Sequence, residues 1–353
     1  SARRHASGVR SIQVMTIPCP FGSHRAIGGG LPQPAERLDP SLPIRANELL
    51  IAVEALNLDS SSMRQIAESC GHDQARMRDY IGEIVRSRGK MHNPVTGSGG
   101  VLIGRVAEIG PDFPRSDIKV GDVICTLVSL SLTPLALTGI GAIDVAAARV
   151  EASGHAILFA SGLFAKLPAD LPQQTAMALC DVAGAPGHVL KMAQPGQVVC
   201  VLGTGRAGLL SLCAARRALG RSGTIIGLDA SADSLERARA LGVADHLEMA
   251  HLRDPVATHR IVAAATDGRL ADLTIATTNV PGCEGAAILG TRPKGRILFF
   301  SMATSFTAAA LTAEGVGRDV EMIIGNGYTE GWVETTFALY RAHPALAAAF
   351  HGQ

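Results

Sequence analysis

The sequence predicts a two-domain α/β protein in which a β-rich half precedes a parallel sheet covered by helices. With 353 residues, 47% of them hydrophobic, the chain is long enough for about two domains. Short apolar runs separated by Gly and Pro fill the first half, whereas strand-like and helix-like segments alternate in the second. We therefore predict one domain over residues 1–170 and a second over 171–353.

Four segments of the first half have the composition of strands, namely 47–56, 101–110, 120–128 and 155–168. Between them, residues 62–90 read SMRQIAESCGHDQARMRDYIGEIVRSRGK, a charged and helix-compatible stretch. This stretch predicts a helical insertion on the surface.

The second half predicts a doubly wound sheet. Its expected strands are 197–202, 224–229, 270–278, 295–302 and 320–328, and its expected helices are 206–220, 231–242 and 332–350. Ser231 is the expected N-cap of the helix that ends at Gly242. Because strands and helices alternate, the strands are expected to run parallel.

Composition excludes several classes of protein. The 32 Lys and Arg balance 31 Asp and Glu, so no basic surface for nucleic acid is expected. No apolar run approaches the roughly 20 residues of a membrane-spanning helix. Seven cysteines without a C-x-x-C pair, and a basic amino terminus without an apolar core, favour a reducing, cytoplasmic setting. The chain begins at Ser, so a processed end is also considered.

A glycine-rich loop lies between an expected strand and an expected helix. It comprises Gly203, Thr204, Gly205, Arg206, Ala207 and Gly208. The three glycines fit the tight turn, the close approach of backbone to a diphosphate and the packing of helix on strand that dinucleotide sites need. Asp229 ends the next strand, where a carboxylate accepts hydrogen bonds from ribose hydroxyls and repels a 2′-phosphate. We therefore predict an NAD site; the alternative is a glycine-rich turn with a helix cap at Asp229.

Several phrases of the sequence extend this interpretation. GRVAEIG, IKVGDVI and QPGQVVCVLGTGRAG, in this order, resemble the medium-chain dehydrogenase/reductase superfamily, whose GroES-like domain precedes a Rossmann domain. NPVTGSGG (93–100), TLVSLSLTPL (126–135), ILFASGLFAKLPADLP (157–172), ALCDVAGAP (178–186) and GNGYTEG (325–331) resemble the L-erythro-3,5-diaminohexanoate dehydrogenase family. The resemblance implies NAD-dependent oxidation of the 3-amino group, which yields 5-amino-3-oxohexanoate, NADH and ammonium in lysine fermentation. Unlike most members of the superfamily, the chain ends on a helix after the second sheet.

The resemblance also implies that the catalytic zinc of the superfamily is absent. Its three ligands would fall near Asp59, at Gly100 and near Cys180 and Asp181, and glycine has no side chain with which to bind a metal. We therefore predict no metal. An ammonium group is far more acidic than an alcohol, so a carboxylate or histidine can take its proton without zinc.

Three residues are therefore candidates for catalysis. Asp59 and Asp181 are expected to hold the two ammonium groups of the substrate, one of them with a pKa raised by burial so that it can move protons. Either could instead cap a helix. His92 is a candidate proton relay, although lone histidines are more often structural.

Polar residues of two segments are candidates for substrate binding: Asn93, Thr96, Ser98, Ser129 and Ser131. The first three belong to a loop that could equally be an ordinary Gly-rich turn. Ser129 and Ser131 are expected on one face of a strand. Thr277, Asn279, Ser301 and Met302 follow expected strands, at the sheet edge where nicotinamide would lie.

Two other functions remain open. One is a zinc-free quinone or enone reductase of the same superfamily, which predicts an apolar pocket and NADPH. The other is a non-catalytic dinucleotide sensor, which predicts binding without turnover. Residues 320–328 near the sheet edge also suggest a homodimer in which the sheet continues across the interface.

Overall fold

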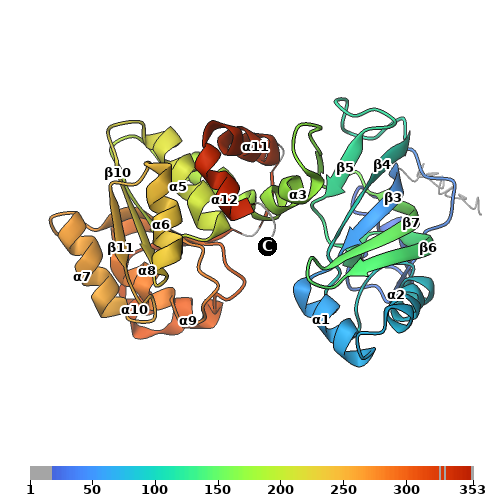
Figure 1. Ribbon diagram of the computed structural model, residues 1–353, viewed down its shortest axis with the longest axis horizontal. Coiled ribbons are helices and arrows are strands. Elements are labelled where there is room, and N and C mark those ends of the chain that lie inside the picture. Colours follow the sequence, from blue (N-terminus) through green and yellow to red (C-terminus); the bar gives the residue numbers. More distant parts are fainter. Residues whose placement is uncertain (1–17, 326, 330, 351–353) are drawn as a thin grey trace, which may run out of the picture. The chain divides into compact units, whose positions relative to one another are not determined.

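A computed structural model of the chain describes residues 18–325, 327–329 and 331–350. It divides into two compact units, Ser1–Lys166 and Leu167–Gln353, so the boundary lies four residues before the predicted one at residue 170. Figure 1 shows both units.

The first unit is built on a six-stranded antiparallel sheet in the order β6-β7-β3-β4-β5-β8. Its elements are η1 (Ser23–Arg25), β1 (Ala26–Ile27), β2 (Arg37–Leu38), β3 (Leu49–Asn57), α1 (Ser60–Ser69), α2 (Gln74–Arg88), β4 (Val101–Ile109), β5 (Val123–Thr126), η2 (Leu130–Leu132), β6 (Leu135–Asp144), β7 (Arg149–Leu158) and β8 (Phe164–Lys166). From Leu49 to Ala55, the strand β3 alternates buried and more exposed side chains, as a strand that packs on one face does.

Two predictions for this unit are wrong. Residues 62–90 are not a surface insertion, because α1 and α2 bury Met63, Ile66, Met77 and Ile81 in the core of the sheet. The many charged residues of this stretch obscured its apolar face, whose residues recur at helical spacing. The expected strand 155–168 is two strands, β7 and β8, separated by a turn.

The second unit has a six-stranded sheet in the order β11-β10-β9-β12-β13-β14, with every pairing parallel. Its elements are α3 (Gln173–Val182), α4 (Gly184–Met192), β9 (Val198–Leu202), α5 (Arg206–Leu219), β10 (Thr224–Asp229), α6 (Ala232–Leu241), β11 (His246–Met249), α7 (Pro255–Ala265), β12 (Ala271–Ala276), α8 (Glu284–Gly290), β13 (Thr291–Phe299), α9 (Phe306–Leu311), α10 (Ala313–Gly317), β14 (Glu321–Ile324), α11 (Trp332–Ala342), η3 (Pro344–Leu346) and α12 (Ala347–Phe350). The strand order reverses direction at β9, which is the switch point of a doubly wound sheet.

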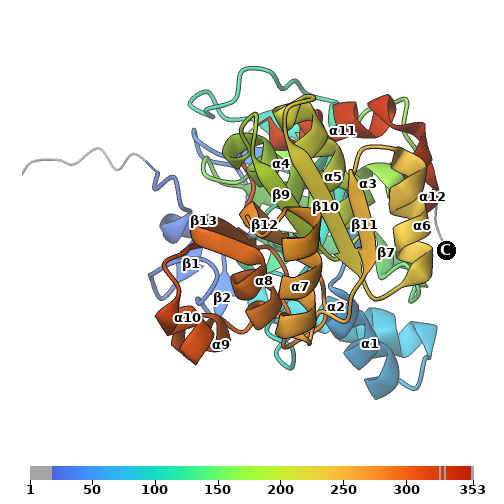
Figure 2. The ribbon, with the colours of Figure 1, turned by 90° about the vertical axis from the view of Figure 1, so that its left-hand side faces the viewer.

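Helices cover this parallel sheet, and α7 and α8 lie side by side in Figure 2. The central strands β9 and β12 are buried at every residue, so both faces of the sheet are covered. The predicted helix 231–242 is confirmed as α6, with the Ser231 side chain accepting from the Ser234 N–H and Gly242 in the left-handed conformation. The expected C-terminal helix is interrupted at Pro344, whose ring cannot continue a helix.

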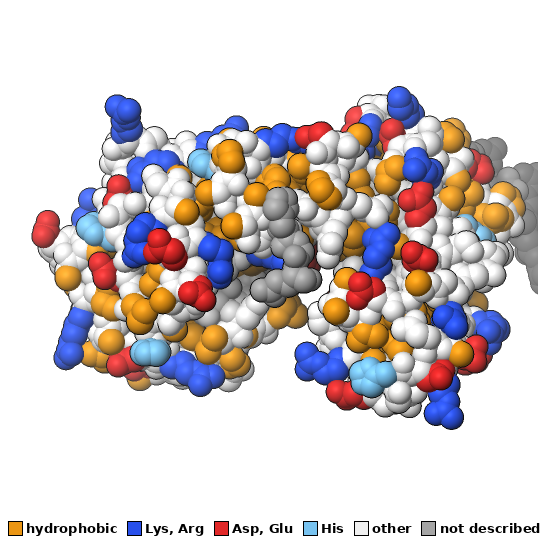
Figure 3. Space-filling view, in the orientation of Figure 1, with side chains coloured by type: hydrophobic (Ala, Val, Ile, Leu, Met, Phe, Trp, Pro, Cys, Tyr) orange, Lys and Arg blue, Asp and Glu red, His pale blue; other side chains and the backbone are white. Residues whose placement is uncertain are grey.

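The surface carries both signs of charge. On the face drawn in Figure 3, Lys and Arg side chains are interspersed with Asp and Glu rather than gathered into one area. Within the described residues, no helix is both long and apolar enough to cross a membrane.

Candidate active site

The glycine loop between β9 and α5 has the geometry that the sequence predicts. Gly203 adopts φ +94°, and a Cβ there would lie 2.8 Å from the Thr278 nitrogen. A Cβ on Gly208 would lie 1.9 Å from the Gly203 oxygen, so only glycine allows the helix to pack this closely. Gly205, by contrast, is the N-cap of α5 and faces open space. A diphosphate could approach the backbone there, beside the free N–H groups of the first turn.

Asp229 completes this loop from the end of β10. Its Oδ2 accepts hydrogen bonds from the Thr204 N–H at 2.6 Å and from the Thr204 hydroxyl at 3.1 Å. Its Oδ1 accepts from the Ser231 N–H at 2.9 Å. A carboxylate offers about four lone-pair positions, so acceptor capacity is left for a ribose hydroxyl.

The other predicted cofactor residues lie on two nearby strand ends and on the first turn of α5. The Thr277 hydroxyl donates to the Gly203 carbonyl at 2.8 Å, which ties the end of β12 to the glycine loop. Asn279 accepts from the Ser301 hydroxyl at 2.9 Å, and Met302 is 83% exposed. Arg206 donates to the Ala349 carbonyl at 2.9 Å, so α12 lies beside the start of α5. Ala207 accepts from the Ser211 hydroxyl within the same helix.

In the first unit, three separate segments converge on one corner beyond the end of β3. The segment 57–62 meets the loop 92–100 because the Gly100 backbone lies against the Asn57 carbonyl. The segment 129–131 meets the same loop from another side, where the Leu130 N–H donates to the Gly100 carbonyl at 2.7 Å. All candidate residues of this unit therefore lie on segments that meet at a single corner.

Hydroxyl groups join two of these segments. The buried Ser62 hydroxyl lies 2.6 Å from the Thr96 hydroxyl and 2.6 Å from the Ser98 hydroxyl. The fully buried Asn93 amide donates to Gln65 at 2.8 Å and accepts from the Val95 N–H at 2.9 Å. Asn93 thus fixes the loop, whereas Thr96 and Ser98 remain partly exposed.

Ser129 and Ser131 do not alternate on a strand, and this prediction is wrong. Ser129 is the N-cap of the short helix η2 and accepts from the Ser131 N–H at 3.2 Å. The buried Ser131 hydroxyl donates to the Ser129 hydroxyl at 2.8 Å. Serine favours such caps because its hydroxyl replaces a missing backbone partner.

His92 is half-buried at the start of the loop, and its Nδ1 is buried without a hydrogen-bond partner. Burial lowers the pKa of His92 below its usual value, and the charges of Lys90 and Arg88 lower this pKa further, while the Gly97 backbone opposes them. A histidine with a lowered pKa is neutral at pH 7 and can accept a proton.

The two candidate aspartates belong to different units. Asp59 stands at the N-cap of α1 and is exposed, yet its carboxylate accepts no capping hydrogen bond. Asp181 lies in the last turn of α3, and its backbone carbonyl accepts from the Tyr328 hydroxyl at 2.8 Å. Both residues are exposed, so the expectation of a buried carboxylate is wrong for Asp59 and for Asp181. Asp59 does occupy an N-cap position, whereas Asp181 lies near the end of its helix and is not an N-cap.

The predicted zinc-ligand position cannot carry any side chain. Gly100 adopts φ +101°, and a Cβ there would lie 2.1 Å from the Asn57 oxygen. Among the described residues, no three His, Cys, Asp or Glu side chains gather closely enough to share a metal ion.

Sequence reasoning missed two residues that hold this corner, Ser62 and Gln65, and the nearby buried Lys90. Ser62 and Gln65 lie on α1, one and two turns after Asp59, and contact a loop about thirty residues later in the chain. Their spacing from Asp59 was the only available signal, since pairing between distant segments leaves no pattern in a single sequence. Lys90 donates to the carbonyls of Pro32 and Gln33 from a fully buried position.

Comparison with solved structures shows the fold. The chain superposes on an alcohol dehydrogenase from Thermus sp. ATN1 with a TM-score of 0.54 and 18% identity, over 86% of this chain and 85% of that one. A mycobacterial protein in complex with NADPH gives a TM-score of 0.52 and 17% identity, over 86% and 82%. The chain therefore has the medium-chain dehydrogenase fold, a GroES-like unit followed by a Rossmann unit.

Comparison with sequences is more specific. Residues 24–168 match the family model of the L-erythro-3,5-diaminohexanoate dehydrogenase N-terminal domain. The L-erythro-3,5-diaminohexanoate dehydrogenase of Acetoanaerobium sticklandii is 46% identical over 336 residues, which cover 94% of this chain and 98% of that protein. The enzyme of the same name from Fusobacterium nucleatum is 45% identical over 339 residues, with the same coverage. The chain therefore belongs to the L-erythro-3,5-diaminohexanoate dehydrogenase family and is an oxidoreductase.

Proposed function

We propose that the protein catalyses the NAD-dependent oxidative deamination of L-erythro-3,5-diaminohexanoate to 5-amino-3-oxohexanoate, a step of lysine fermentation that is reversible as reductive amination. The observation that carries this proposal is the 45–46% identity to two enzymes of that name over 94% of the chain. Each turnover consumes one water and releases one ketone, one ammonium ion, one proton and one NADH. A reducing, cytoplasmic location is part of the proposal and is supported by seven free cysteines.

The residues of the second unit fit a dinucleotide. Gly203, Gly205 and the first turn of α5 would hold the diphosphate, and Asp229 would accept from the adenosine ribose. Asp233 lies four residues after Asp229, and no Lys or Arg lies between them, which favours NAD over NADP. When bound, the nicotinamide supplies a hydride acceptor. The chain itself must orient the substrate and move its protons.

Proton transfer comes first, because the nitrogen lone pair must form the C=N bond as hydride leaves carbon. We assign this transfer to the corner that holds Asp59 and His92. His92 is neutral at pH 7, as a proton acceptor must be, while the unused Asp59 carboxylate would pair with a substrate ammonium. Thr96 and Ser98 would hold the polar end of the substrate. Asp181 would pair with the second ammonium group. Water then adds to the iminium carbon, and ammonia departs.

Substitution of Asp59 tests this assignment. We expect Asp59→Asn to lower kcat/KM at least about 100-fold, the lower bound for loss of a group that acts in proton transfer or substrate orientation. Asp112→Asn is the matched control, because Asp112 is an exposed carboxylate near the opposite end of β3 and should leave kcat/KM unchanged. Equal kcat/KM in the two variants would remove Asp59 from the mechanism.

The pH profile tests His92 separately. Since burial lowers the pKa of His92, the acid limb of the kcat/KM profile is expected below the ordinary histidine pKa of about 6.5. In His92→Gln this limb should disappear together with most of the activity. An acid limb that persists unchanged in His92→Gln would assign it to another group.

We also propose that the protein is a homodimer in which β14 pairs with its symmetry mate. β14 is the edge strand of the parallel sheet, and Ile324 at its end is 62% exposed. An apolar edge strand is a template for pairing. Light scattering should give twice the chain mass, and Ile324→Lys should give the chain mass. A monomeric wild-type protein would refute the dimer.

A further inference from the structure

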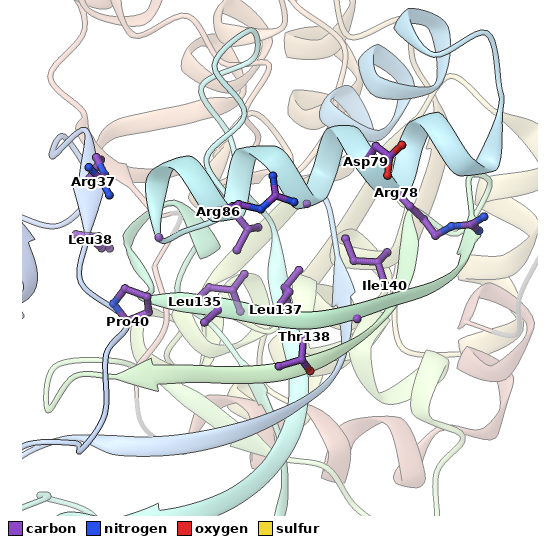
Figure 4. Close-up of a pocket in the computed structure, with 15 residues that line it drawn as sticks. Arg37, Leu38, Pro40, Arg78, Asp79, Arg86, Leu135, Leu137, Thr138 and Ile140 are labelled. Carbon is purple, nitrogen blue, oxygen red and sulfur yellow. The ribbon is translucent and has the colours of Figure 1, made fainter.

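The first unit contains a cavity that the proposed reaction does not use. Its volume is about 580 Å³, within the range of small-molecule sites. It lies between the helix α2 and the strand β6, as Figure 4 shows. None of the candidate catalytic or substrate-binding residues lines it.

Two contacts hold the walls of this cavity together at its ends. At one end, the Gln74 side chain of α2 donates to the Ile143 carbonyl at 3.1 Å and accepts from the Ile143 N–H at 3.3 Å. At the other end, the Leu135 N–H donates to the Gly89 carbonyl at 2.8 Å. Because β6 is an edge strand, its free edge runs past α2 between these two points.

The cavity combines apolar side chains of β6 with charged side chains, namely three arginines and the carboxylate of Asp79. The partly exposed Leu137 and Ile140 of β6 supply apolar surface, whereas Leu135 is fully buried in the core. Figure 4 shows Arg37 and Arg86 towards one end, and Arg78 with Asp79 towards the other. Arg86 is paired with Glu83. Within the described part of the chain, neither Arg37 nor Arg78 has an ion-pair or hydrogen-bond partner, although Arg78 is half-buried. A planar guanidinium without a partner suits a carboxylate or phosphate.

A glycine keeps the cavity open. Gly82 lies in the middle of α2, where glycine costs roughly 1 kcal/mol relative to alanine. Its backbone does not need glycine, since a Cβ would meet only Ile140 Cδ1 at 3.6 Å and Arg86 Nη2 at 3.8 Å, both ordinary contacts. The folded chain therefore gives no reason for glycine at this position, whereas a larger side chain would fill the space between α2 and β6.

We propose that this cavity binds a small organic anion with an apolar chain of several carbons. The chain would lie on Leu137 and Ile140, and the anionic group would pair with Arg78 on the side away from Asp79. The two elements that form the cavity walls are close in sequence to the corner that holds Asp59 and His92. The helix α2 ends four residues before His92, and β6 begins four residues after Ser131. An occupant would thus touch both elements that lead into that corner.

The test compares three probes by titration calorimetry on the full chain. Octanoate has both the chain and the charge, octylamine has the same chain with the opposite charge, and acetate has the charge alone. Octanoate should bind at least about tenfold more tightly than either. Binding of octylamine as tightly as octanoate, or no binding of octanoate, would overturn the proposal. An acidic peptide that binds along β6 when octanoate does not would replace it with strand addition.

Matched variants locate the binding. Gly82→Leu, which fills the cavity, and Arg78→Gln, which removes the charge, should each raise the Kd of octanoate at least about tenfold. Arg76→Gln is the control, because Arg76 is exposed on the same helix but does not line the cavity. Gly82→Ala should fold and still bind, and Arg78→Gln decides the matter if Gly82→Leu does not fold. Octanoate binding that is unchanged in Arg78→Gln would refute the site. These titrations need no turnover, so they are independent of the proposed reaction.

Discussion

Lys90 is a buried ammonium group that no carboxylate neutralises within the described part of the chain. Its Nζ donates to the carbonyls of Pro32 and Gln33, each at 2.9 Å, and burial lowers its pKa to about 8. The unfolded chain, with a lysine pKa near 10.5, therefore binds more protons between these two values. In this window the contribution of Lys90 to the free energy of unfolding must rise with pH.

Comparison with Lys90→Met isolates this effect. Between pH 8 and 10.5, the free energy of unfolding of the wild type should rise relative to that of the variant, by at most about 1.4 kcal/mol per pH unit. Urea unfolding at several pH values measures the difference. If the free energies of unfolding of the wild type and the variant differ by a constant amount through this window, Lys90 is not a buried ammonium.

Glu48 is a second buried charge, and it is fully paired. It accepts from Arg25 at 2.6 and 2.9 Å, from the Arg45 N–H at 2.7 Å, and lies 2.7 Å from His24. Burial alone would raise the pKa of Glu48, but the hydrogen bonds from Arg25 and Arg45 bring it below its usual value. The stabilisation is therefore present above the unfolded pKa of about 4.5 and is lost as pH falls through the folded pKa.

Glu48→Gln should lower the free energy of unfolding at pH 7 by about 3 kcal/mol, because Arg25 then loses its closest charged partner in a buried site and keeps only the more distant Asp39. The wild-type advantage should shrink in acid. Glu54→Gln is the control, since the Glu54–Arg105 pair is largely exposed and should contribute less than about 1 kcal/mol. Equal losses in both variants at pH 7 would contradict this account.

At the scale of elements, different glycines of the β9–α5 loop serve two purposes. Gly208 is needed for the packing of the helix, and Gly205 leaves room for a cofactor. Gly208 packs against Gly203, whereas Gly205 faces open space with ordinary dihedrals. Gly205→Val should therefore leave the thermal unfolding of the free protein nearly unchanged and weaken NAD+ at least about tenfold. Gly208→Val should destabilise the free protein itself. NAD+ binding that survives Gly205→Val would place the diphosphate elsewhere.

The elements differ in how far the sequence could predict them. Buried strands such as β9 and β12 are apolar along their whole length and were predictable, as was the glycine loop beside them. The strand β6 was not, because its exposed edge carries Thr138, Gly139 and Gly141 and shows no apolar alternation. The helix α4 was not predicted, because its sequence GAPGHVLKM buries small residues and lacks a helical apolar stripe.

The candidate site follows the same rule. His92, Thr96 and Ser98 could be named as candidates from the sequence, because Thr96 and Ser98 lie in the phrase NPVTGSGG and His92 directly precedes it. The partners that hold this loop, Ser62 and Gln65, were not, because they come from α1 and meet it only in the folded unit. The sequence alone indicated the loop 92–100 as a candidate, and only the structure shows which side chains of α1 hold it.

At the scale of the whole molecule, the fold and the family are shown by different observations. The superposition on a solved alcohol dehydrogenase shows the fold, a GroES-like unit followed by a Rossmann unit, while the 45–46% identity to two named enzymes shows the family. The chemistry proposed for this chain needs both units: the Rossmann unit would hold the hydride acceptor, and the corner of the first unit would move the proton.

The most direct test of that chemistry is the ratio of ammonium to NADH formed from L-erythro-3,5-diaminohexanoate and NAD+. The account predicts a ratio of one, unchanged after chelation and with little turnover when NADP+ replaces NAD+. NADH formed without ammonium, or no turnover although NAD+ binds, would contradict oxidative deamination as the activity of this protein.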